Sequence, residues 1–153
     1  MRRDGRHGPG SLLAAAIPAL VPLCVLVACS SSGEDAETPT PSGPSGALGV
    51  VTRQAANAVV QGLCVMRSTY ANDLEQANAV YYERVNDDLR VIVAAAEIRD
   101  QSVVAVLLQA RERVKRDLTS LQAPEGFADD VGALLSATRD ALEVIGLPTP
   151  GCA

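Results

Sequence analysis

The sequence contains no tryptophan and a single histidine, His7, among its 153 residues. His7 lies in an N-terminal segment that we expect to be removed, so the remaining chain has no imidazole group. This absence excludes Ser-His-Asp and Cys-His catalysis, histidine acid–base chemistry and histidine metal ligands. Motifs that hold phosphate or position a nucleophile are absent as well. We therefore predict that the protein is not an enzyme and carries no cofactor.

No apolar run is long enough for a typical transmembrane helix, which requires about 20 apolar residues. The first ten residues, MRRDGRHGPG, are mostly basic or small. An apolar run of residues 11–28 follows, and it contains Pro18 and Pro22, each of which removes a helical hydrogen bond. This order of a cationic and then an apolar segment predicts a cleaved signal peptide over residues 1–28.

The end of the apolar run resembles the lipobox of bacterial lipoproteins, because its last residues and the next one read LVAC. An ordinary secretory cleavage site needs small residues at the first and third positions before the cut, and Leu26 is large. The resemblance implies that Leu26, Val27 and Ala28 are recognised by the processing enzymes. It also implies that the chain is cut before Cys29 and that the Cys29 thiol carries diacylglycerol. An uncleaved anchor and a plainly secreted protein are the alternatives.

Four cysteines are present, and two of them are accounted for by the signal. Cys24 leaves with it, and Cys29 receives the lipid. Cys64 and Cys152 remain outside the reducing cytosol, where disulfides persist, so we predict that they form a disulfide. Two free buried thiols are the alternative. Zinc and iron–sulfur sites need closely spaced cysteine and histidine ligands, so we predict no metal site.

Residues 29–46, CSSSGEDAETPTPSGPSG, contain no large apolar side chain. Such a segment buries too little surface to offset the entropy of ordering, so it predicts a flexible tether. Recognition of its proline-containing part by a partner is an alternative. The composition becomes rich in Ala, Val and Leu from residue 47, which predicts one small domain over residues 47–153.

Apolar residues recur at intervals of three and four through this domain, which is typical of amphipathic helices. Asp73 has the chemistry of an N-cap, and Asp100 or Ser102 is the expected cap after a turn at residues 99–102. The fold class is therefore predicted to be all-α, a small antiparallel four-helix bundle. The expected helices cover residues 48–71, 74–96, 104–121 and 127–145.

The predicted disulfide constrains this bundle. Cys64 lies about two-thirds along the first expected helix, whereas Cys152 follows the last helix. The tail after the last helix would have to rise roughly 20 Å, near the limit for six extended residues. Either the tail runs along the groove between the first and last helices, or the first helix begins after residue 48.

Without the signal peptide the chain has 10 basic and 17 acidic residues, a net charge of −7. No basic surface for nucleic acid or anionic lipid is expected. Glu83 and Asp87 lie one helical turn apart and are a candidate cation pair, although ordinary solvated acids have the same spacing. Tyr82 is a candidate exposed contact residue next to a core Tyr81.

Arg111 interrupts the apolar face of the third expected helix. We expect it to pair with a buried acid such as Asp100 or Glu97, because a single polar residue in an apolar seam often specifies register. The alternative is an arginine that binds a ligand. Tyr82, Glu83, Asp87 and Arg111 are thus the candidate partner or ligand contacts.

The LVAC box, the Ser/Thr/Pro tether and the single lysine resemble small lipoproteins of high-GC Gram-positive bacteria. This resemblance implies a lipid anchor at the extracytoplasmic face of the cell membrane. We expect a non-catalytic structural or protein-interaction module with a partner protein in the cell envelope. The alternative is a lipoprotein that binds a small ligand or cation in its helical bundle. A cavity with converging polar groups would favour the second, and a filled core with exposed apolar residues the first.

Overall fold

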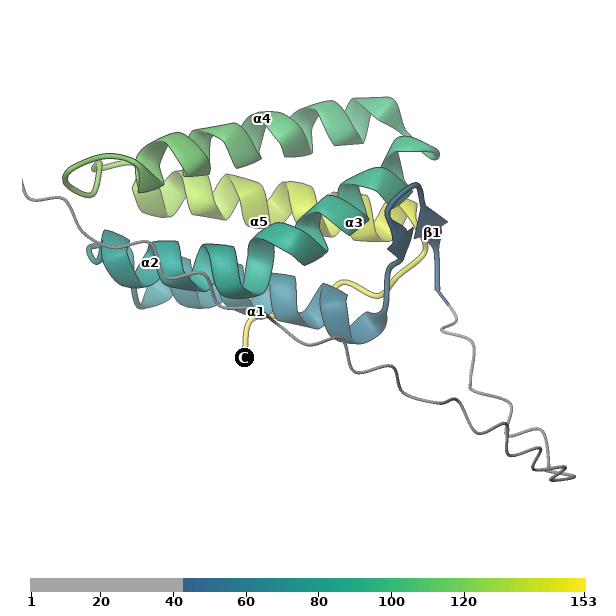
Figure 1. The fold of residues 1–153 in the computed structure, drawn as a ribbon, viewed down its shortest axis with the longest axis horizontal. Coiled ribbons are helices and arrows are strands. Elements are labelled where there is room, and N and C mark those ends of the chain that lie inside the picture. Colours follow the sequence, from purple (N-terminus) through teal and green to yellow (C-terminus); the bar gives the residue numbers. More distant parts are fainter. Residues whose placement is uncertain (1–42) are drawn as a thin grey trace, which may run out of the picture. The chain divides into compact units, whose positions relative to one another are not determined.

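The computed structural model describes residues 43–153, which are mostly helical. The predictions for the signal peptide and for residues 29–42 of the tether lie outside these residues. Figure 1 shows the helices stacked alongside one another, with a small hairpin at one end. The elements are β1 (Ser45–Gly46), β2 (Gly49–Val50), α1 (Arg53–Ser68), α2 (Leu74–Val80), the π-helical turn η1 (Tyr81–Val85), α3 (Asn86–Glu97), α4 (Gln101–Leu118) and α5 (Phe127–Val144).

The N-terminal hairpin was not predicted. Strands β1 and β2 pair antiparallel, and Gly49 has a φ of 124°, a conformation that favours glycine. A Cβ atom on Gly46 would lie 2.5 Å from the backbone of Ala94, so β1 packs directly on α3. The expected tether boundary at residue 46 and the expected helix start at residue 48 are therefore wrong. Helix α1 begins at Arg53, where the Thr52 side chain accepts a hydrogen bond from the Ala55 amide.

The second expected helix is interrupted by η1. Ala77, Tyr81, Val85 and Leu89 are all fully buried and are spaced four residues apart. In an α-helix each step of four residues overshoots one turn, so three steps would rotate Leu89 by about 120° away from Ala77. A π-helical turn has wider hydrogen-bonded rings and offsets this drift. The turn therefore keeps four side chains on one buried face.

Two aspartates begin helices as predicted. Asp73 Oδ1 accepts a hydrogen bond from the Gln76 amide at 3.1 Å and caps α2. Asp100 Oδ1 accepts bonds from the amides of Ser102 and Val103 at 2.8 and 3.2 Å and caps α4. Helices α3 and α4 are therefore separate. The hydrogen bonds from the Ser102 side chain and from the two amides lower the pKa of Asp100.

Helix α5 packs against both α4 and α1. Its predicted apolar face is confirmed from Phe127 to Ile145. Helix α4 ends at Leu118, three residues earlier than expected, because the hydroxyls of Thr119 and Ser120 donate back to the Arg116 carbonyl. Leu121, which was predicted to belong to the core, is fully exposed as a result.

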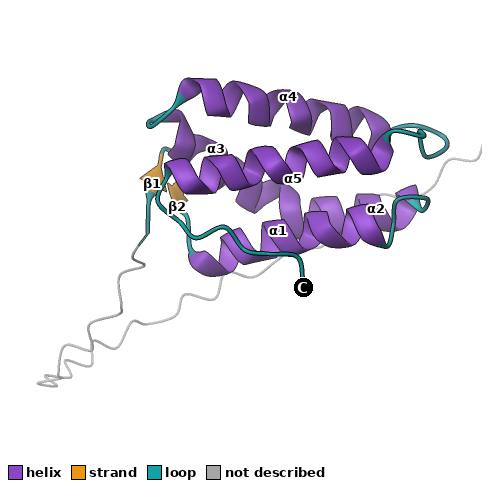
Figure 2. Cartoon of the chain, turned by 180° about the vertical axis from the view of Figure 1, so that it is seen from behind, coloured by secondary structure: helices purple, strands orange, loops and turns teal. Residues whose placement is uncertain are grey.

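The predicted disulfide between Cys64 and Cys152 is confirmed, with a Cα–Cα distance of 5.7 Å. Figure 2 shows the C-terminal tail running alongside α1. Gln61 of α1 donates to the Gly151 carbonyl at 2.7 Å, and Arg139 Nη2 of α5 lies 3.7 Å from Cys152 Sγ. The tail thus runs along α1 and α5, and α1 begins at Arg53 rather than at the predicted residue 48. Both of the predicted ways in which Cys152 could reach Cys64 are therefore present.

Candidate functional site

Arg111 lies half-buried on α4, but its partners are not the predicted acids. Its Nε donates to the Tyr81 hydroxyl at 3.3 Å, and its Nη2 donates to Asn86 Oδ1 at 3.0 Å. Asp100 is excluded by distance, since 11 residues of helix separate it from Arg111 by about 16 Å. Among the described residues the ion pairs are Arg113–Asp130 and Lys115–Glu112. Arg111 is therefore held by two uncharged acceptors within residues 43–153.

The π-helical turn positions the first of these acceptors. Tyr81 is fully buried at the start of η1, as its place on the apolar stripe predicted. Burial raises the pKa of the Tyr81 hydroxyl, and the hydrogen bond from Arg111 opposes this rise only in part. Its ring meets that of Tyr82 edge-on, with centroids 5.1 Å apart. Tyr82 itself is 48% exposed, which confirms the prediction that it is a surface residue.

Beside Arg111 lies a hollow of about 270 Å³, which we name the Arg111 groove. The hairpin, α3 and α4 each contribute to it. Arg90 and Arg111 supply guanidinium groups, Glu97 supplies a carboxylate, and the rest of the lining is apolar. Its residues are Ala47, Leu48, Arg90, Val93, Ala94, Glu97 and Arg111.

Of the residues that line this groove, only Arg111 was predicted as a contact residue from the sequence. Arg90, Val93, Ala94 and Glu97 have the three-and-four spacing of one helix face, and this signal was available. The contribution of Leu48 had no such signal, because it depends on a hairpin that packs on α3 through Gly46.

Glu83 and Asp87 are both exposed. Asn86 Nδ2 donates to Asp87 Oδ1 at 2.9 Å, so Asp87 connects through Asn86 to Arg111. Glu83 has no hydrogen bond to this group of residues within the described part of the chain. Over residues 43–153, no group of three or more histidine, cysteine, aspartate or glutamate side chains is arranged to hold a metal ion.

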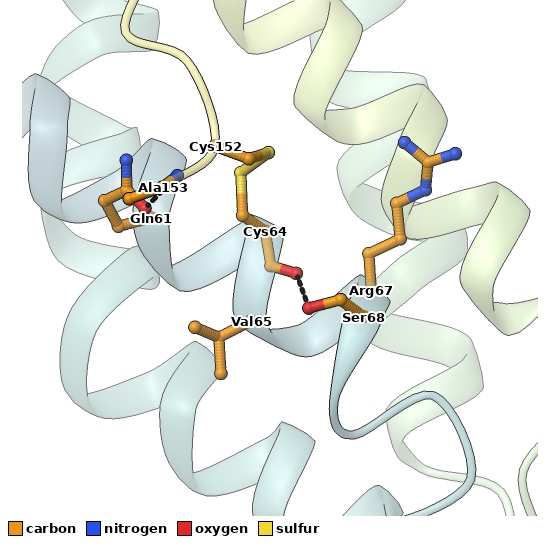
Figure 3. A pocket seen from close by; sticks show the side chains of 7 residues that line it. All are labelled: Gln61, Cys64, Val65, Arg67, Ser68, Cys152 and Ala153. Carbon is orange, nitrogen blue, oxygen red and sulfur yellow. Dashed lines mark hydrogen bonds between the residues drawn. A yellow bond between two sulfur atoms is a disulfide. The ribbon is translucent and has the colours of Figure 1, made fainter.

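A second hollow, of about 310 Å³, lies beside the disulfide (Figure 3). Ser68 Oγ donates to the Cys64 carbonyl at 2.9 Å, so its hydroxyl is used within α1. The Arg67 side chain extends away from the disulfide towards α5, where it covers Gly132. The polar groups of this hollow do not converge on a common point, so we assign it a structural role together with the disulfide.

A pair of acids lies between α4 and α5. Arg113 Nε is 2.9 Å from Asp130 Oδ1, so Arg113 pairs across the helices rather than with Asp117, four residues along its own helix. Asp117 is 8% exposed, and its Oδ2 has no hydrogen-bond partner among residues 43–153. Burial raises the pKa of Asp117, and the neighbouring Asp130 carboxylate raises it further. This pair belongs to the contact between α4 and α5.

The predicted lipidation residue Cys29 and the recognition residues Leu26, Val27 and Ala28 lie outside the described residues. Over residues 43–153, no helix has both the length and the apolar character required to cross a membrane. Comparison with protein-family models, curated proteins and solved structures found no match to this chain.

Proposed function

We propose that the protein is a lipoprotein, anchored through Cys29 at the extracytoplasmic face of the cell membrane. In this proposal the helical domain is a non-catalytic protein-interaction module of the cell envelope. The LVAC box at the end of the apolar run and the polar tether after it support the anchor. The absence of imidazole after residue 7 supports a role without catalysis.

One observation carries the choice of an interaction module: the core is filled, while large apolar side chains remain exposed at the surface. The largest fully buried side chains belong to one core cluster, and they include Tyr81, Phe127, Leu63, Leu89, Leu107, Leu134 and Leu142. Hollows beside the disulfide, at the start of α2, at the hairpin and beside Val106 all include exposed residues in their lining. Contact with a partner protein marks those exposed apolar residues that gather into a patch, and the large exposed apolar side chains of the described chain are the candidates. They are Leu48, Tyr82, Ile98, Val106, Leu108 and Leu121.

The proposal includes an antiparallel up-down arrangement of the four main helical segments. Short connections between them favour this topology, since neighbouring helices joined by a few residues normally pack antiparallel. The disulfide supports a rigid module, because it ties the tail to α1 near the C-terminal end of that helix.

A second candidate function is binding of a small ligand. The Arg111 groove favours it, because Arg90, Glu97 and Arg111 line one hollow of about 270 Å³. The groove is open along the exposed residues of the hairpin and α3, which makes it a weaker fit to a small ligand than an enclosed pocket.

Photo-crosslinking in cells tests the preferred function. A crosslinking amino acid is placed at Leu48, Tyr82, Val106 and Leu121 of the full chain, with the exposed polar Ser136 as the control position. We expect a discrete protein adduct from at least one apolar position and none from Ser136. If no position gives an adduct, while envelope metabolites raise the melting temperature, ligand binding replaces the preferred function.

The anchor is tested separately by metabolic labelling with an alkyne fatty acid. We expect label on the wild-type protein in the membrane fraction. A Cys29→Ala variant is expected to carry no label. Equal labelling of the two proteins would contradict lipidation at Cys29.

A further inference from the structure

We propose that the Arg111 groove binds an extended segment of a partner protein in which a carboxylate side chain has an aliphatic neighbour. The carboxylate would lie between Arg90 and Arg111, and the aliphatic side chain would pack on Leu48 and Val93. This inference rests on the proposed function as an interaction module and names the chemistry that its partner presents.

Arg111 is prepared for an anion. Its two hydrogen bonds, to Tyr81 and Asn86, orient the guanidinium without neutralising it. A guanidinium has five N–H donors, so three remain after these bonds are made. A half-buried arginine with uncharged partners keeps its attraction for a carboxylate, whose two oxygens match the planar donor arrangement.

Arg90 adds a second positive charge to the same groove from α3. It is exposed, and within residues 43–153 it makes no ion pair or side-chain hydrogen bond. The chain after the signal peptide has a net charge of −7, whereas Arg90, Arg111 and Glu97 together give this hollow a net charge of +1. Charge complementarity at this point favours an acidic partner group.

The hairpin supplies the apolar side of the groove. Leu48 is 54% exposed at the turn between β1 and β2. The contact of Gly46 with the α3 backbone and the hydrogen bond from the Val51 amide to the Pro44 carbonyl, at 2.8 Å, hold the hairpin in place. Leu48 is therefore a positioned apolar contact, and an aliphatic side chain beside the carboxylate would bury it together with Val93.

Glu97 favours a singly charged group with nearby N–H donors. Its carboxylate would repel a doubly charged phosphate more strongly than a single carboxylate, and it would accept a hydrogen bond from a backbone N–H group of a peptide. An anionic bilayer would also be repelled by the net charge of −7. Arg90 and Arg111, which donate hydrogen bonds, and Glu97, which accepts them, thus match a peptide chain with an acidic side chain.

The test is a titration of the full chain followed through the arginine Nε–H signals by nuclear magnetic resonance. The probes are the peptide acetyl-Ala-Leu-Glu-Leu-Ala-amide and the matched peptide with Gln in place of Glu. Inorganic phosphate, phosphatidylglycerol vesicles and free leucine form the other arms. We expect saturable shifts at Arg90 and Arg111 with the Glu peptide alone.

Variants separate binding from stability. Arg90→Gln removes an exposed side chain and should weaken the Glu peptide by about tenfold while leaving the urea unfolding midpoint unchanged. Leu48→Ser should lower the affinity for the Glu peptide by about threefold to tenfold, because an apolar contact is lost. Arg116→Gln, on the exposed side of α4, is the matched control and should bind the peptide as the wild type does.

Equal binding of the Gln peptide, or no saturable shift with the Glu peptide, would overturn the proposal. If phosphate, vesicles or free leucine bound at Arg90 and Arg111 more tightly than the Glu peptide does, the proposal would be overturned as well. Crosslinked adducts from Val106 or Leu121 but none from Leu48 would reject this groove and leave the interaction module standing. Absence of adducts at every position would instead count against the module itself.

Discussion

Removal of the disulfide should lower the free energy of unfolding by an amount that follows from its place in the sequence. Cys64 and Cys152 are 88 residues apart, so the bond closes most of the described chain into one loop. In the chain-entropy treatment, closing a loop of this length stabilises the fold by about 4.5 kcal/mol at 25 °C. With a urea dependence of about 1.5–2 kcal/mol per molar, the unfolding midpoint should fall by about 2–3 M.

The assay is urea unfolding followed by circular dichroism. It compares the oxidised wild type, the wild type with a thiol reductant, and a Cys64→Ala/Cys152→Ala variant. The last two should unfold together, since both open the same loop. Gln61→Ala in the oxidised protein serves as the control for the tail contacts alone. It should cost only about 1 kcal/mol.

The reasoning would be refuted if the oxidised and reduced proteins unfolded within about 0.5 M urea of each other, since loop closure would then contribute little. A Gln61→Ala variant as unstable as the reduced protein would also refute it. In that case the hydrogen bonds of the tail, rather than the constraint on the unfolded chain, would provide the stability.

Further substitutions at Asp117, at two glycines and at two leucines test the packing. Asp117→Asn should stabilise the protein at pH 7, because burial raises the pKa of Asp117 in the folded state. The wild type therefore loses stability as pH rises above the pKa of an aspartate in the unfolded chain, about 3.9. In urea titrations repeated towards pH 4, the stability difference between the variant and the wild type should shrink. Gly46→Ala should cost about 1–3 kcal/mol in urea unfolding, because the methyl group meets the α3 backbone, whereas Gly126→Ala, in open space, should be nearly neutral. Leu107→Ala should cost about 2–5 kcal/mol, since this side chain is fully buried. Leu121→Ala should leave the melting temperature unchanged, and a loss equal to that of Leu107→Ala would place Leu121 in the core after all.

Much of the helical structure was predictable because its signals act over a few residues. Asp73 and Asp100 cap the amides two or three residues later, as their chemistry indicated. The apolar face of α5 and the pairing of Cys64 with Cys152 were also correct. Capping and periodicity depend on neighbours along the chain, so no knowledge of packing was required.

The predictions that were wrong concern contacts between different helices or strands. The start of α1 was placed five residues early, because the hairpin forms only with Gly46 against α3. The charge of Arg111 suggested an acid, whereas the structure brings Tyr81 and Asn86 to it from the π-helical turn and α3. Spacing along one helix does not determine which residues of another helix lie opposite.

By itself, the sequence determined the helical character of the domain, two of its N-caps and the pair of cysteines available for a bond. These properties follow from backbone hydrogen bonding, from periodicity and from the small number of thiols. Only the tertiary structure decided that Arg90, Arg111 and Leu48 share one groove and that Arg113 pairs with Asp130. Those contacts join residues far apart in the chain, and they exist only because helix packing brings particular faces together.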